Sequence, residues 1–277
     1  MKLSTTTLGC PDWTLDQIVE NCSALGFQGV DFRGLQGEID VTMLPEFKEC
    51  ISTTKTKIEN FGLEVSGISS SIRICVSEML NDNLEEARRT IEVVRALGCE
   101  RVRVFGGGDS NRYSHAKLAN EGSRTMEKIL QLDGALEIEW MLETHDTWID
   151  PNLCSVLLQR IASPAFGILW DVGHTARMGN ISHHETFKII NNRTCYVHVK
   201  DAIKDPSHPQ AMKDGWRYVV PGKGSLQLEV AMALLKEGGY SGWVMFEHEK
   251  RWHSDLEEPE IIFPQFIAWA KRFIGER

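Results

Sequence analysis

Short apolar runs alternate with longer amphipathic stretches along almost the whole chain. The runs are four to six residues long and nearly continuous in apolar character. This pattern is typical of strands that are buried on both faces, as in a parallel sheet covered by helices. We therefore predict eight β-strands, at residues 3–8, 29–32, 64–69, 101–105, 139–143, 167–171, 195–199 and 242–247.

The stretches between these runs have helical periodicity and recognisable ends. Thr14 precedes one of them and Gln17 follows three positions later, which is the pattern of a capping box, and Gly26 stands where that helix would end. Apolar residues in the segment 83–97 fall on one helical face. We predict eight helices, at residues 14–25, 42–60, 83–97, 115–132, 151–162, 182–191, 226–237 and 259–274.

A strand followed by a helix, repeated eight times, favours a single closed (β/α)8 TIM barrel over an open doubly wound sheet. The length of 277 residues suits one such barrel of about 250 residues. Because no Pro-, Gly- or Ser-rich linker divides the chain, we expect residues 1–277 to form one TIM-barrel domain. The longest irregular stretch, 201–222, would lie on the side of the barrel where active sites form.

Composition and charge exclude several classes of protein. The hydrophobic fraction of 42% and the charged fraction of 25% are those of a globular protein, not of a disordered one. A net charge of -9 disfavours binding to nucleic acid, whose phosphates attract basic surfaces. No apolar run approaches the roughly 18 residues of a membrane span, and the first residues lack the apolar stretch of a signal peptide. Seven scattered cysteines indicate reduced thiols, so we expect a cytoplasmic protein without membrane or nucleic-acid partners.

Four consecutive late strands end in the same way, with two apolar residues followed by Glu143, Asp171, His198 or Glu247. In a barrel, this end of each strand faces the active site, and neighbouring strands lie only about 4.8 Å apart. Three carboxylates brought together repel one another unless a cation lies among them. An oxygen-rich set with one imidazole suits a divalent ion, with Mn²⁺ expected first and Mg²⁺, Co²⁺ or Zn²⁺ as alternatives. The competing interpretation is that backbone groups satisfy each polar side chain separately.

Four motifs resemble those of the xylose isomerase-like barrels, also called the sugar phosphate isomerase/epimerase family. The motifs are LETHD (142–146), LWDVGH (169–174), HVKD (198–201) and FEHEKRWH (246–253), and the resemblance runs over nearly the whole chain. It implies one metal ion bound by Glu143, Asp171, His198 and Glu247. The spacing of Asp171 and His174 also matches the family, and implies that His174 contacts oxygen atoms of the substrate.

The resemblance also implies a reaction. It is that of a divalent-metal-dependent isomerase or epimerase, which transfers a proton next to a carbonyl through a metal-bound enediolate. The substrate would be a small carbohydrate, namely a sugar, a sugar phosphate or a related keto-polyol. Glu143 and Glu247 would be the catalytic pair, one removing a proton from carbon and the other returning one. Because members of the family are commonly dimers or tetramers, the resemblance is compatible with a homo-oligomer.

Departures from the family keep other reactions open. Ketohexose 3-epimerases carry a second glutamate where this chain has Ile149, and an arginine where it has Lys204, which argues against a free ketohexose. Inosose and dehydroshikimate dehydratases resemble this chain equally in the metal set, so a lyase acting on a keto-polyol or 3-keto-sugar is the alternative. Abasic-site endonucleases are a remote alternative, because they need additional histidines on the third and fourth strands, where this sequence has none.

Further polar residues near the predicted strand ends are candidate substrate contacts, each with a structural role as the competing interpretation. They are His145, Arg33, Lys200, Asp201, Lys223 and Trp252. Two glycine-rich turns, at 106–108 and 221–224, could present backbone N–H groups to an anion such as phosphate.

Overall fold

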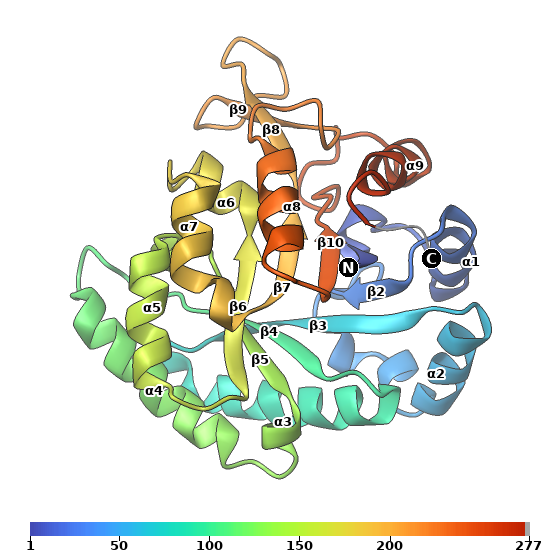
Figure 1. Ribbon diagram of the computed structural model, residues 1–277. Helices are drawn as coiled ribbons and strands as arrows, with labels where there is room; N and C mark the ends of the chain where they lie inside the picture. The colour runs from blue at the N-terminus through green and yellow to red at the C-terminus, as the bar shows by residue number, and fades with distance from the viewer. Residues whose placement is uncertain (275–277) are drawn as a thin grey trace.

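Eight parallel strands close into a barrel, and helices surround it (Figure 1). The computed structural model describes residues 1–274. Around the barrel the strands follow the order β1-β10-β7-β6-β5-β4-β3-β2, so sequence neighbours are spatial neighbours throughout. The strands are β1 (Lys2–Thr6), β2 (Gly29–Phe32), β3 (Glu64–Arg73), β4 (Arg101–Phe105), β5 (Glu139–Glu143), β6 (Phe166–Asp171), β7 (Thr194–Val199) and β10 (Trp243–Phe246). The predicted (β/α)8 barrel is confirmed.

All eight predicted barrel strands are present, and three of them have the predicted ends. The largest difference is β3, which continues four residues beyond its predicted end at Ser69, to Arg73. Its pairing with β4 shifts register between Ser69 and Arg73, where the strand is irregular. A local irregularity of this kind leaves no trace in an alternating pattern, because residues 66–70 of this strand are all buried.

Helices connect the strands on the outside of the barrel (Figure 1). The first of them confirms its predicted cap: Thr14 Oγ1 accepts from the Gln17 amide at 3.3 Å, and Gln17 Oε1 accepts from the Thr14 amide at 2.9 Å. The helices are α1 (Leu15–Leu25), α2 (Ile51–Asn60), α3 (Leu80–Leu97), α4 (His115–Leu130), α5 (Pro151–Arg160), α7 (His183–Ile190), α8 (Leu228–Glu237) and α9 (Pro259–Ala270).

The predicted helix over 42–60 is wrong in its first half. Two short 3-10 turns, Val41–Met43 and Pro45–Phe47, precede α2 there. Pro45 is the cause, because a proline disfavours the helical conformation in the residue before it, and Leu44 is extended, with φ -87° and ψ 147°.

The stretch 201–222 is not irregular throughout. It contains an antiparallel hairpin of β8 (Asp201–Lys204) and β9 (Trp216–Val219), which projects above the barrel (Figure 1). A short helix, α6 (Val172–Arg177), also follows β6 directly. Both elements were missed because four to six residues are too few to display a clear period. Both stand over the carboxyl ends of the barrel strands.

The barrel interior changes from apolar to polar along the barrel axis. A small apolar cluster lies inside the barrel, made of Met141, Leu169, Tyr196, Trp243 and Met245. Next to it lies a buried polar group, in which the Asp31 carboxylate accepts from Ser69 Oγ at 2.7 Å and from the Tyr196 hydroxyl at 3.4 Å. Charged side chains collect beyond this layer, at the carboxyl ends of the strands. In the described part of the chain, no helix combines the length and the apolar character that crossing a membrane requires.

Candidate functional site

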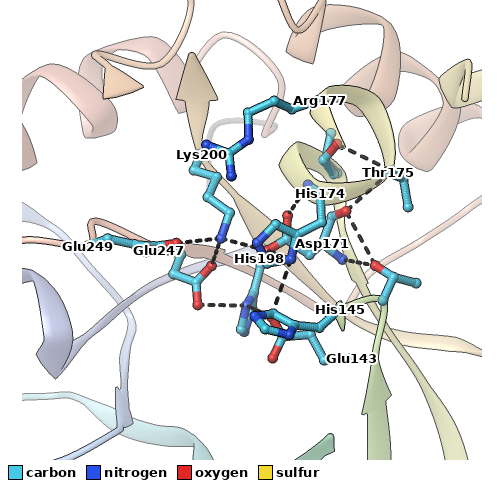
Figure 2. A network of polar contacts seen from close by, with 12 residues as sticks. Glu143, His145, Asp171, His174, Thr175, Arg177, His198, Lys200, Glu247 and Glu249 are labelled. Atoms are coloured by element: carbon cyan, nitrogen blue, oxygen red, sulfur yellow. Dashed lines mark hydrogen bonds and ion pairs between the residues drawn. The ribbon is translucent and has the colours of Figure 1, made fainter. Parts of the chain in front are cut away.

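Four side chains converge at the carboxyl end of the barrel (Figure 2). Glu143 is the last residue of β5 and Asp171 the last of β6. His198 lies in β7, in register with Asp171, and Glu247 follows β10 directly. All four are buried, and one ligand atom of each lies within 4.8 Å of the others. The structure thus brings together the four residues that the strand ends singled out.

The unpaired atoms in this cluster fit a divalent cation. His198 Nδ1 lies 3.4 Å from Glu247 Oε1 and 3.7 Å from Glu143 Oε1. Among residues 1–274, neither ring nitrogen of His198 has a hydrogen-bond partner, although the side chain is 1% exposed. Buried polar atoms without partners are costly, and each calls for a ligand, an ion or a water. Carboxylate oxygens with one imidazole nitrogen form a donor set that Mn²⁺, Mg²⁺, Co²⁺ or Zn²⁺ accepts.

Lys200 forms ion pairs with two carboxylates of this cluster. Its Nζ lies 2.9 Å from Asp171 Oδ2 and 2.7 Å from Glu249 Oε1, and it also contacts Glu247 Oε2. Burial alone would lower the pKa of Lys200, but the charges of Asp171 and Glu247 outweigh it and raise that pKa well above its usual value. Lys200 is therefore a charged group that orients Glu247, leaving the other oxygen of Glu247 toward His198. The Tyr218 hydroxyl, from the hairpin, donates to Glu249 Oε1 at 3.1 Å.

Asp171 has a second role as the N-cap of α6. Its Oδ1 accepts from the His174 amide at 2.7 Å, and its Oδ2 lies 3.1 Å from His174 Nδ1. Burial raises the pKa of Asp171 to about 7, against the opposing charge of Lys200. Burial also lowers the pKa of His174 well below its ordinary value, so this imidazole is neutral. The helix that sequence patterns missed thus places His174 against the cluster.

His145 and His174 form one wall beside Glu143 (Figure 2). Their ring centroids are 4.6 Å apart, and ligand atoms of the two histidines and Glu143 lie within 4.8 Å of one another. His145 Nδ1 lies 2.8 Å from Asp146 Oδ1, and its ring packs on Phe105 at a centroid distance of 4.8 Å. Both histidines, which the sequence analysis predicted as substrate contacts, therefore lie next to Glu143.

Arginine side chains line the neighbouring part of the mouth. Arg103 Nε lies 3.5 Å from Glu143 Oε2, with both side chains almost fully buried. The sequence analysis missed Arg103, although a charged residue inside the apolar strand of residues 101–105 was a signal. Arg33, which follows β2, donates through Nη1 to Ser71 Oγ at 2.8 Å. Burial, together with the charge of Arg103, lowers the pKa of Arg33 to about 10.

Asp201 is engaged by backbone groups. Its Oδ2 accepts from the amides of Gly222 and Gly224, both at 2.9 Å, and its Oδ1 accepts from the Ala202 amide at 2.9 Å. The glycine turn at 221–224 therefore binds a carboxylate of the chain itself. The expectation that this turn holds a phosphate is wrong, because the amides of Gly222 and Gly224 already donate to Asp201.

Two other candidates lie away from the four-residue cluster. Lys223 is exposed, and its Nζ donates to Gln265 Oε1 at 3.4 Å, on α9. Trp252 is 55% exposed and packs beside Arg251, whose guanidinium carbon is 5.7 Å from its ring centroid. Within residues 1–274, neither has a recorded hydrogen bond or ion pair to the cluster.

A hollow of about 600 Å³ lies at the opposite end of the barrel. Several of its charged residues form ion pairs: Lys2 Nζ lies 2.7 Å from Glu64 Oε2, and Arg101 Nε lies 3.1 Å from Glu139 Oε2. Within residues 1–274, both groups of acidic and histidine side chains that are close enough to hold a metal ion lie at the carboxyl end of the barrel and not at this hollow. Chemistry therefore points to the carboxyl end of the barrel, where this fold places active sites.

Several proteins are similar to this chain in sequence. An inosose dehydratase of Geobacillus kaustophilus is 21% identical, over 95% of this chain and 87% of its own length. An inosose dehydratase of Clostridium beijerinckii is 28% identical, over 40% of this chain and 37% of its own length.

Solved structures share the fold. A probable 3-DHS dehydratase, AsbF of Bacillus anthracis, superposes with a TM-score of 0.78 at 16% identity, covering 97% of this chain and 98% of that one. The IolI protein, whose structure has a bound zinc atom, superposes with a TM-score of 0.79 at 15% identity over the whole of both chains. The sequence pattern of the xylose isomerase-like TIM barrel matches residues 19–272. The chain therefore belongs to the xylose isomerase-like TIM barrel family.

Proposed function

We propose that this chain is a divalent-metal-dependent isomerase or epimerase that acts on a sugar, a sugar phosphate or a related keto-polyol. The observation that carries the proposal is the buried convergence of Glu143, Asp171, His198 and Glu247, with ligand atoms within 4.8 Å of one another. A divalent ion held by these four residues would act as a Lewis acid toward a carbonyl and an adjacent hydroxyl. Side chains of the site would carry out the proton transfers.

Glu143 and Glu247 are suited to act as the acid/base pair. They stand on β5 and directly after β10, and β6 and β7 lie between these two strands in the barrel. The two carboxylates therefore approach a substrate from different sides. One can remove a proton from carbon next to a carbonyl, and the other can return a proton to a neighbouring position or to the opposite face. Arg103 lies beside Glu143 and Lys200 beside Glu247, so each carboxylate has a cation next to it.

The two histidines beside Glu143 would bind oxygen atoms of the substrate. His174 is neutral because burial lowers its pKa, and in the described part of the chain its Nδ1 has no hydrogen-bond partner. Its ring meets that of His145 nearly edge to face, at an interplanar angle of 78°. These imidazoles would orient the hydroxyl groups of a sugar next to the acid/base pair.

A dehydratase is the second candidate, and the group formed by Glu143, His145 and His174 favours it. Elimination of water needs an acid beside the departing hydroxyl as well as a base beside the carbon. His145, whose Nδ1 lies 2.8 Å from Asp146 Oδ1, is in reach of the same substrate edge as Glu143. The similarity to the Geobacillus kaustophilus inosose dehydratase extends over 95% of this chain, which supports the same candidate.

Deuterium exchange separates these candidates. The Mn²⁺-loaded protein is incubated in D₂O with a panel of keto-sugars, sugar phosphates and inososes, followed by NMR and ultraviolet absorbance. We expect deuterium to enter the carbon next to the carbonyl for the true substrate class. An epimer or isomer without loss of water supports the isomerase, whereas an unsaturated or diketone product supports the dehydratase. A metal-loaded protein that exchanges no substrate of the panel would contradict the proposal.

A further inference from the structure

Arg103 is a buried cation whose hydrogen-bonding capacity is largely unused. It lies in β4 and is 3% exposed, yet its Nε and Nη1 have no hydrogen-bond partner within residues 1–274. Its nearest carboxylate oxygen, Glu143 Oε2, is 3.5 Å from Nε, which is an ion pair without a hydrogen bond. A guanidinium has five N–H donors in a fixed fork, and leaving them unsatisfied in the interior is unfavourable.

Phe105 fixes the orientation of this guanidinium. The guanidinium carbon of Arg103 lies 3.8 Å from the centroid of the Phe105 ring, and His145 packs against the same ring at 4.8 Å. Arginine stacked on an aromatic face keeps its N–H groups in the plane of the fork, free to bind another group. Arg103, Phe105 and His145 therefore form a continuous wall that reaches the substrate side of Glu143.

Arg33 adds a second guanidinium. Its Nη1 donates to Ser71 Oγ at 2.8 Å and to the Ser69 carbonyl at 3.4 Å, which holds it beside the strand ends of β2 and β3. The charge of Arg103, together with burial as the larger cause, lowers the pKa of Arg33. Ser69, whose carbonyl accepts from Arg33, is the strand partner of Arg103, so the two arginines lie at neighbouring positions of the sheet. An anion shared between two such cations would be stabilised by both.

The nearby carboxylates are already engaged by other donors. Asp31 Oδ1 accepts from Ser69 Oγ at 2.7 Å, and Glu86 Oε1 accepts from the Ser71 amide at 2.6 Å. Asp146 Oδ1 pairs with His145 at 2.8 Å. These three carboxylates therefore do not occupy the N–H donors of the two arginines.

We propose that Arg103 and Arg33 form a subsite for an anionic group, a carboxylate or a phosphate ester, carried by the substrate of the proposed active site. This inference rests on the proposed function and narrows its substrate class to acidic sugar derivatives, that is, sugar acids or sugar phosphates. Arginine forks bind both anions in a bidentate manner. The contact of Arg103 with Glu143 places the anionic group next to the carbons that react.

The first test uses simple anions and does not depend on catalysis. The unfolding temperature of the Mn²⁺-loaded protein is measured with sulfate, with acetate and with chloride at the same ionic strength. We expect sulfate or acetate to raise it more than chloride does, and we expect this excess to disappear in Arg103→Gln and in Arg33→Gln. Arg101→Gln is the matched control, because Arg101 lies on the same strand but pairs with Glu139 at the other end of the barrel. The control should respond as the wild type does.

The second test compares three forms of one ketose by calorimetry: D-fructose, D-fructose 6-phosphate and D-fructuronate. Contacts to the sugar hydroxyls are common to the three. The affinity of an anionic form divided by that of the neutral sugar therefore measures what the anionic group contributes to binding. We expect one anionic form to bind about tenfold or more tightly than the neutral sugar, with the ratio near one in Arg103→Gln and partly restored in Arg103→Lys. The preferred form identifies phosphate or carboxylate as the group.

The outcomes separate the subsite from the proposed function. The subsite is overturned if sulfate and acetate raise the unfolding temperature of the wild type no more than chloride does. It is also overturned if their excess effect survives in both Arg103→Gln and Arg33→Gln, whatever the result with the sugars. An anion effect lost in both variants, with no sugar turned over or bound, supports the subsite and contradicts the proposed activity. Circular dichroism and metal content of each variant confirm that it is folded and loaded.

Discussion

Lys200 Nζ lies 2.9 Å from Asp171 Oδ2 and also contacts Glu247, so one buried ammonium touches two of the four side chains proposed to bind the metal. It contacts Glu247 Oε2, while Glu247 Oε1 faces His198 at 3.4 Å. Groups behind the ligands that fix their orientation are a general requirement of metal sites. Lys200 would therefore act as a positioning residue and also as the counter-charge of the cluster before metal binds.

Replacing Lys200 should make stability depend strongly on metal. Lys200→Met leaves Asp171, Glu247 and Glu249 without their cation, and breaking a buried ion pair costs about 3–5 kcal/mol. A bound divalent ion supplies positive charge to the same carboxylates, so Mn²⁺ should stabilise the variant more than the wild type. Urea unfolding with and without Mn²⁺ measures this. Lys223→Met, on the exposed turn, is the control, and equal metal effects in both proteins would rule the idea out.

Metal content tests the ligand set directly. Elemental analysis of the purified wild type should give one equivalent of a divalent metal, and Asp171→Ala and His198→Ala should each lose it, because each removes a donor from a buried cluster. His253→Ala, in the loop after β10, should keep it. Wild-type metal content in Asp171→Ala would show that the ligand set is wrong, and about three zinc ions in the wild type would favour the nuclease alternative.

Glu247→Gln tests the acid/base role. The amide keeps the shape and one oxygen of the side chain but cannot accept a proton from carbon. We expect turnover to fall about 10²-fold or more, the range typical of general acid–base groups, with metal still bound. Glu257→Gln, an exposed residue of the same loop, should leave turnover unchanged. Normal turnover of a metal-loaded Glu247→Gln protein would exclude the assignment.

His183 should make the protein less stable in acid. Its Nε2 is paired with the Leu226 carbonyl at 2.5 Å, and burial lowers its pKa below the ordinary value near 6.5. Below pH 6.5 the unfolded chain takes up a proton at His183 that the folded chain does not. The contribution of His183 to the free energy of unfolding is therefore present above that pH and lost as the pH falls below it. Between pH 7.5 and 5.5 the wild type should lose up to about 1.4 kcal/mol more than His183→Gln. Chemical unfolding at both pH values gives this difference, and parallel losses would refute it.

Asp201 should matter for stability. Asp201→Ala removes the acceptor of three backbone amides at 2.9 Å, and leaving such donors without a partner costs about 1–3 kcal/mol each where they are buried. Gly224→Ala should act similarly, because its Cβ would lie 1.9 Å from Asp201 Oδ1. Gly37→Ala has open space around it and should be neutral. Thermal unfolding compares the three, and an unchanged Asp201→Ala protein would contradict the structural role.

The alternation of buried strands and amphipathic helices by itself determined the barrel. Strands such as Arg101–Phe105 and Glu139–Glu143 were predictable to the residue, because short and mostly apolar runs between helical stretches are typical of strands buried on both faces. The same logic singled out Glu143, Asp171, His198 and Glu247, because parallel strands bring their carboxyl ends to one side whatever the loops do.

Only the tertiary structure decided which polar residues next to these strand ends meet the cluster. Lys200 and Asp201 are adjacent in sequence, yet one contacts the cluster and the other binds the amides of Gly222 and Gly224. Successive side chains of an extended chain point to opposite sides, and the loop packed on each side decides their partners. Arg103 and α6 were missed for related reasons: a single charge in a strand and a helix of six residues have no period of their own, so their partners come from distant segments.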